Sequence, residues 1–84
     1  MEDIRKTIAD YIKNEFGVDD ADRDFTYDVN LFDYGYVDSL GAATIISFIE
    51  ATYNIEVTQK DLMLYSLSTI NEIAEFAEKR LGIR

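Results

Sequence analysis

The chain contains no cysteine, no histidine and no proline in its 84 residues. Without cysteine and histidine it forms no disulfide and lacks the ligands of the usual zinc sites. The absence of histidine also removes the base that most serine nucleophiles need. Lysine is the remaining candidate base, but no catalytic motif surrounds Lys6, Lys13, Lys60 or Lys79. We therefore expect no metal site and no catalytic activity of the chain's own.

Basic side chains are scarce, since 8 lysines and arginines face 17 acids and give a formal net charge of -9. This balance opposes binding to nucleic acids and to anionic lipids, and it favours basic protein surfaces as partners. No apolar run approaches the ~20 residues of a membrane span. The start, Met1-Glu2-Asp3, is acidic where a signal peptide would be basic. We expect a cytoplasmic monomer with no membrane span.

The apolar content is high enough for a folded protein, because 48% of the residues are hydrophobic and 13% are aromatic. The length predicts one domain over residues 1–84. A first helix is predicted over about Glu2 to Phe16, with acids in its first turn and an end near Gly17. Its apolar stripe follows helical spacing through Ile4, Ile8, Tyr11, Ile12 and Phe16.

Three further helices follow from local signals. One should run from Asp38 or Ser39 to Tyr53 and stop at Asn54. A brief helix is predicted near Gln59–Leu64, after a link whose residues "IEVT" allow a short extended stretch. Thr69 and Glu72 form a capping-box pattern before a last helix that ends at Gly82. The predicted fold is all-α, a small four-helix bundle of three long helices and one short helix.

The segment 18–36 between the first two long helices lacks helical periodicity and holds five aspartates between Asp19 and Asp28. We expect a long ordered loop that its own apolar residues hold in place. Three of the aspartates have the initial spacing of a calcium loop, but Phe25 and Leu31 stand where that loop needs glycine and glutamate. The carboxylates of Asp33 and Asp38 are interpreted as solvated loop groups rather than an acid-base pair.

Ser39 stands where a helix begins, so the simplest interpretation is that Asp38 or Ser39 caps the helix. The outer face predicted for that helix is nearly uncharged, which is unusual for so acidic a chain and favours a docking surface. Leu40 is assigned to docking, while Phe48 either docks a partner or lies buried under the long loop. The roles of Tyr34 and Tyr36 stay open. The outer-face residues are Leu40, Thr44, Ser47, Phe48 and Ala51.

The pattern Asp33-x-Gly35-x-x-Asp38-Ser39-Leu40, between a first and a second amphipathic helix, resembles the acyl carrier protein family over essentially the whole chain. The resemblance implies that Ser39 carries covalent 4'-phosphopantetheine from coenzyme A, with Asp38 and Leu40 as flanking site residues. It further implies a carrier without catalysis. Its partners would be a phosphopantetheinyl transferase, an acyl- or aminoacyl-activating ligase and downstream acyl-transfer enzymes.

Two departures from the commonest fatty-acid carriers bear on the pathway. Between Gly35 and Asp38 stands one extra residue, a spacing similar to D-alanyl carriers and to other carriers loaded by adenylating enzymes. Gly41 and Thr44 occupy positions where fatty-acid carriers often have acids, and Glu50 is the first acid after Asp38. Fatty-acid, D-alanyl and specialised-metabolite pathways stay open, with the last two favoured. The rival hypothesis is an unmodified helical module for protein-protein interaction.

Overall fold

The computed structural model describes residues 3–82 and contains four helices in that range. They are α1 (Ile4–Phe16), α2 (Ser39–Tyr53), α3 (Gln59–Leu64) and α4 (Ile70–Leu81). The all-α prediction of three long helices and one short helix is confirmed. The described residues contain no strand, and the "IEVT" link, where the sequence allowed a short extended stretch, has no regular secondary structure. The expected helical start at Glu2 lies outside the described residues.

The helix ends follow from short-range capping interactions. Asp3, expected within the first turn, is instead the N-cap of α1, and its side chain accepts a hydrogen bond from the amide of Arg5 at 3.0 Å. Asn54 ends α2 in the left-handed conformation at φ 53°, as predicted. The predicted capping box of Thr69 and Glu72 begins α4.

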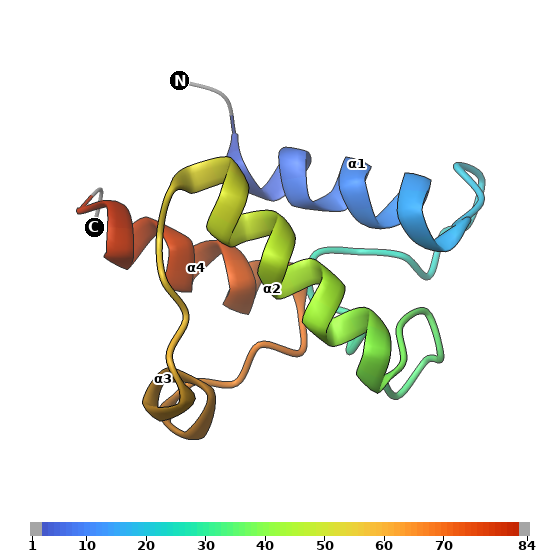
Figure 1. Cartoon of the computed structure of the whole chain (residues 1–84). Helices are drawn as coiled ribbons and strands as arrows, with labels where there is room; N and C mark the ends of the chain where they lie inside the picture. The colour runs from blue at the N-terminus through green and yellow to red at the C-terminus, as the bar shows by residue number, and fades with distance from the viewer. Residues whose placement is uncertain (1–2, 83–84) are drawn as a thin grey trace.

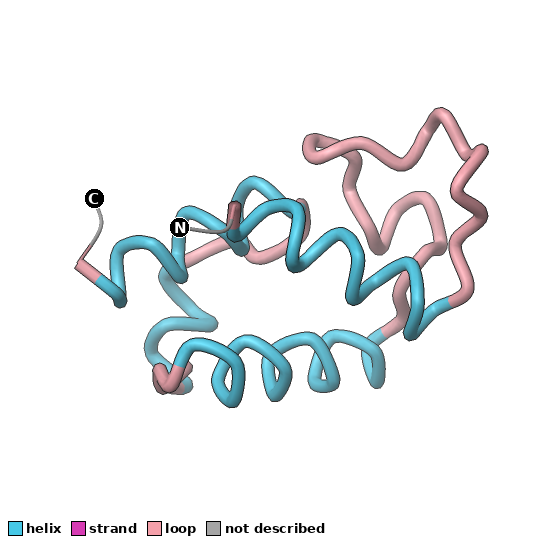
Figure 2. The backbone as a smooth tube through the Cα atoms, turned by 90° about the horizontal axis from the view of Figure 1, so that it is seen from above, coloured by secondary structure: helices cyan, strands magenta, loops and turns pink. Residues whose placement is uncertain are grey.

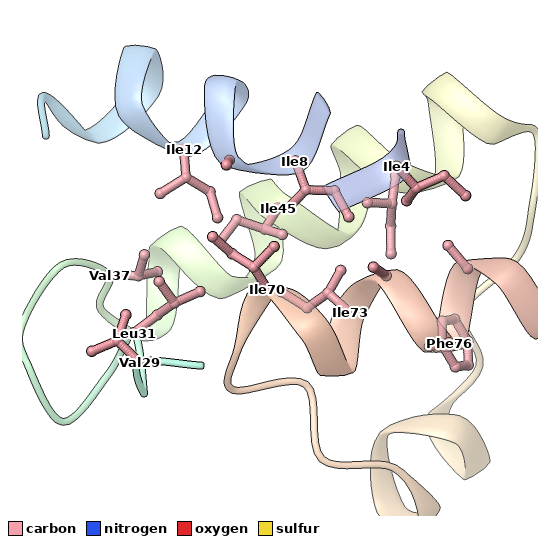
Figure 3. Close-up of a cluster of buried hydrophobic side chains, with 14 residues drawn as sticks. Ile4, Ile8, Ile12, Val29, Leu31, Val37, Ile45, Ile70, Ile73 and Phe76 are labelled. Carbon is pink, nitrogen blue, oxygen red and sulfur yellow. The ribbon is translucent and has the colours of Figure 1, made fainter. Parts of the chain in front are cut away.

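The core lies where α1, α2 and α4 meet. Figure 1 shows α1 above α2 and α4, with α3 set apart below them. Isoleucines from the three long helices fill the centre, where Figure 3 shows side chains of α1 and α4 pointing toward one another. The fully buried large side chains are Ile8, Ile12, Leu31, Ile49 and Ile70. Removal of this apolar surface from water is the main stabilising contribution.

The long loop between α1 and α2 is ordered and closes one end of the bundle (Figure 2). Val29, Leu31 and Val37 from the loop are buried in the same core. The loop is also hydrogen-bonded to the start of α4, because the Leu31 amide donates to the Ser68 carbonyl at 2.9 Å. The expectation that the loop's own apolar residues hold it in place is confirmed.

Candidate functional site

Ser39 is the first residue of α2, and its side chain is exposed. Asp38 is the N-cap, with extended backbone at φ -102° and ψ -176°. One carboxylate oxygen of Asp38 accepts a hydrogen bond from the Gly41 amide at 2.8 Å. Of the two capping candidates in the sequence, the structure therefore selects Asp38. The hydroxyl of Ser39 is not needed to begin the helix.

The segment that leads into Ser39 is held against the core. The Val37 amide donates to the Leu31 carbonyl at 3.1 Å, and the Val37 side chain is buried. Gly35, with φ at 76°, makes the turn two residues earlier, in a conformation that glycine adopts without strain. Ser39 is thus an exposed residue at the end of an ordered segment.

The two loop tyrosines, whose roles the sequence left open, differ in environment. The Tyr36 hydroxyl donates to Asp22 at 2.9 Å, and its ring packs edge-on against Phe25. Partial burial, followed by the Asp22 hydrogen bond and nearby acidic charge, raises the pKa of Tyr36 to about 12. The ring of Tyr34 stacks parallel to Tyr36 and is 63% exposed. Tyr36 therefore stabilises the loop, and the ring of Tyr34 covers the ring of Tyr36 from the solvent side.

The five residues predicted for the outer face of α2 are all at least partly exposed. Leu40 is 81% exposed, while Ser47 and Ala51 are also exposed and Thr44 is partly exposed. Phe48 is partly exposed like Thr44, and its ring stacks on Tyr11 of α1 with centroids 3.9 Å apart. This contact with α1 was in neither of the two alternatives for Phe48.

Gly41 is buried and contributes nothing to the outer face of α2. Ala43 and Thr52 are also exposed and were missing from the predicted set. The outer face still contains no charged side chain from Ser39 to Ile49. The face that begins beside Ser39 is therefore uncharged, as predicted.

A cavity of about 280 Å³ lies between α2 and α3. The α2 residues on its wall start one turn after Ser39, at Ala42, and continue with three isoleucines. The opposite wall comes from α3 and the segment that follows it, including Leu62, Tyr65 and Leu67. The cavity is mainly apolar, with hydroxyl groups from the α3–α4 link at its edge.

An ion pair between a buried carboxylate and an exposed arginine connects α3 to α4. Asp61 is the only buried residue of α3, and its carboxylate pairs with Arg80. The hydrogen bond from the Thr58 amide to Asp61, at 2.9 Å, lowers the pKa of this carboxyl, and the Thr58 hydroxyl and Arg80 add to the effect. This ion pair was not predicted, because its partners are 19 residues apart and no local pattern relates them.

The aspartates examined in the sequence as an acid-base pair or as calcium ligands do not form a catalytic or metal site in the described residues. Asp33 and Asp38 are exposed, and Asp38 serves as the helix cap. Asp19 and Asp22 accept hydrogen bonds from backbone amides within the loop. Within residues 3–82, no cluster of three or more acidic side chains could hold a metal ion. None of the helices in that range is both long and apolar enough to cross a membrane.

Comparison with protein families supports the resemblance seen in the sequence. A family model described as "Phosphopantetheine attachment site" matches residues 6–77, from α1 through most of α4. No significant match was found among curated proteins. The matched domain carries covalent 4'-phosphopantetheine and has no catalytic activity itself. The chain therefore belongs to the phosphopantetheine-binding family of carrier proteins.

Proposed function

We propose that Ser39 is the residue that bears phosphopantetheine, and that the chain delivers an acyl or aminoacyl group to partner enzymes. The observation that supports this proposal most directly is the exposed hydroxyl of Ser39 at the first position of α2, within the family match. When bound, the group supplies a terminal thiol that holds the carried acid as a thioester. The partners are a phosphopantetheinyl transferase, an acyl-activating ligase and acyl-transfer enzymes.

In the attachment step, the Ser39 oxygen forms a bond to the phosphorus next to pantetheine in coenzyme A. The bond from that phosphorus to the bridging oxygen breaks, adenosine 3',5'-bisphosphate leaves, and the serine proton passes to a base on the transferase. The positive end of the α2 dipole favours an anionic phosphodiester at this position. Asp38 begins α2 beside Ser39, and we propose Leu40 as the apolar contact for the docked enzyme.

We further propose that the carried acid is a small one, such as D-alanine or a specialised acid, loaded by an adenylating ligase in the cytoplasm. One observation supports this choice over a fatty-acid pathway. The outer face of α2 lacks charge from Ser39 to Ile49, so it offers no acids to a basic synthase surface.

Intact mass spectrometry tests the attachment site. The purified chain is incubated with coenzyme A and a broad-specificity phosphopantetheinyl transferase. We expect a mass gain of one phosphopantetheine group, none in Ser39→Ala, and a normal gain in Ser47→Ala, which removes another exposed hydroxyl from the same helix. A gain that survives in Ser39→Ala contradicts Ser39 as the site. No gain in the parent chain supports the rival hypothesis of an unmodified interaction module.

The nature of the cargo is tested on the modified chain. Adenylating ligases are supplied with D-alanine or other short acids, and a malonyl transferase of fatty-acid synthesis serves as the comparison. We expect loading by one of the ligases and little by the malonyl transferase. Because the docking face is uncharged, the ligase rate should change by less than about threefold between low and high salt. Efficient malonyl loading that falls steeply with salt would support the fatty-acid pathway instead.

A further inference from the structure

Gly41 differs from the other glycines of the chain in the reason for its presence. Gly17, Gly35 and Gly82 have positive φ angles and open space around the position of a Cβ atom. Gly41 has an ordinary helical backbone, but a Cβ built there would lie 2.7 Å from Val37 Cγ1 and 2.8 Å from Phe16 Cε1. Gly41 is therefore required for close packing and not for its backbone conformation.

Three separate parts of the chain meet at this contact. Phe16 is the last residue of α1, Val37 ends the long loop, and Gly41 lies in the first turn of α2. Figure 3 shows Val37 at the end of the core, beside Leu31. Ser39 stands midway in sequence between the buried residues Val37 and Gly41, and its own side chain is exposed. Buried residues thus flank the serine on both sides, and one of them, Gly41, lies close to Phe16 of α1.

We propose that Phe16, Val37 and Gly41 are positioning residues that fix the Ser39 hydroxyl for the transferase. The inference rests on the proposed function, since it assumes that Ser39 is the attachment residue. In-line attack on phosphorus requires a closely defined oxygen position, and a displacement of about 1 Å can reduce a rate up to ~100-fold. The contact among the three residues ties the first turn of α2 to the end of α1, and so limits movement of the serine.

The stiffness of the contact explains why a side chain at position 41 would displace the serine. Val37 is β-branched and only 4% exposed, so its Cγ1 has little freedom to move away. The Phe16 ring is partly buried and closes the other side. A methyl group at position 41 is therefore accommodated mainly by moving the first turn of α2, which carries Ser39.

Val37 also lies in the stretch that gives this chain its extended Gly35–Asp38 spacing. The Val37 side chain lies against the first turn of α2, and the missing side chain at Gly41 provides the room. In this chain the two positions are therefore parts of one contact.

The test measures kcat/KM for transfer of phosphopantetheine to the chain, at a temperature where circular dichroism shows each variant to be folded. We expect Gly41→Ala to lower kcat/KM by about tenfold or more. Val37→Ala alone should lower it about threefold, because the serine loses one support. In the double variant Val37→Ala/Gly41→Ala the new methyl group gains the space left by valine but still meets the Phe16 ring, so the rate should recover only in part.

Gly82→Ala is the matched control. It makes the same substitution and strains the end of α4 at φ 77°, but it fills no packed space near Ser39. Its loading rate should equal that of the parent chain. The proposal is overturned if Gly41→Ala loads at the parent rate, or if Gly82→Ala loses as much as Gly41→Ala.

Two outcomes separate this proposal from the function on which it rests. If the parent chain gains no phosphopantetheine, or gains it at another residue, the proposed function has failed. If the parent chain is modified at Ser39 and the variants all load at the parent rate, only the positioning role has failed. If Gly41→Ala does not fold, the test rests on kcat/KM of Val37→Ala. An unchanged kcat/KM in that variant overturns the proposal.

Discussion

The hydroxyl of Tyr36 donates a hydrogen bond to the carboxylate of Asp22 at 2.9 Å, across 14 residues of the long loop. The bond connects the acidic first half of the loop to the segment that leads into Ser39. Because the pKa of Tyr36 is raised to about 12, the phenol stays neutral and keeps its proton well above pH 10.

This relationship predicts a loss of stability at alkaline pH. A group whose pKa is higher in the folded than in the unfolded chain stabilises the fold below the unfolded value, and the contribution is lost as pH rises through the folded value. For Tyr36 the window runs from about pH 10 to about pH 12. Urea unfolding at a series of pH values in this window measures the free energy of unfolding. It should fall more steeply with pH in the parent chain than in Tyr36→Phe. Equal slopes would contradict the assignment.

Asp61 predicts the opposite behaviour at acid pH. Its pKa is lowered in the folded chain, so the carboxylate stabilises the fold above about pH 4, and this contribution disappears as pH falls through the folded value. Asp61→Asn should melt at a lower temperature than the parent at pH 7, and the difference should narrow toward pH 3. Asp10→Asn, which alters an exposed ion pair with Lys6, is the control and should change little.

The cap of α2 can be tested by two substitutions of Asp38. Asp38→Ala removes the acceptor of the Gly41 amide and should lower the free energy of unfolding by about 1 kcal/mol. Asp38→Asn retains an acceptor oxygen and should cost much less. Denaturant unfolding at neutral pH measures both. An equal loss in the two variants would mean that the charge of Asp38, rather than its hydrogen bond, stabilises the start of α2.

Leu40 and Phe48 should respond differently to removal of their side chains. Leu40 is 81% exposed, so Leu40→Ala should change the free energy of unfolding by less than about 0.5 kcal/mol while slowing loading by the ligase. Phe48 packs on Tyr11, and Phe48→Ala should cost about 2 kcal/mol. Denaturant unfolding and loading assays on the same samples measure the two effects. A stable Phe48→Ala variant with impaired loading would return Phe48 to the docking face.

The sequence was most informative where structure depends on near neighbours. The stop at Asn54 and the capping box of Thr69 and Glu72 each involve residues within three or four positions, and both were predicted. The start of α2 was left between Asp38 and Ser39, because either side chain can accept a hydrogen bond from the first turn. Only the structure shows that Asp38 takes this role and leaves Ser39 exposed.

Features that depend on how distant segments meet could not be predicted. The contact of Phe48 with Tyr11 was not predicted, because the packing of α1 against α2 brings the two rings together. The Asp61–Arg80 pair depends in the same way on the place of α3 beside α4. Gly41 did give a signal, since a glycine within a helix costs about 1 kcal/mol relative to alanine and so indicates a packing requirement.

The Asp61–Arg80 ion pair has a consequence for how the bundle opens. Apart from Asp61, every residue of α3 is exposed, including Leu62, Met63 and Leu64, whereas the long helices share a continuous apolar core. Because none of its side chains belongs to that core, α3 should unfold locally at a much lower free energy than the long helices. Amide hydrogens of residues 62–65 should exchange with deuterium well before those of Ile8, Ile49 and Ile73, and Asp61→Asn should widen the difference. The wall of the cavity opposite α2 is then the part of the protein that opens first.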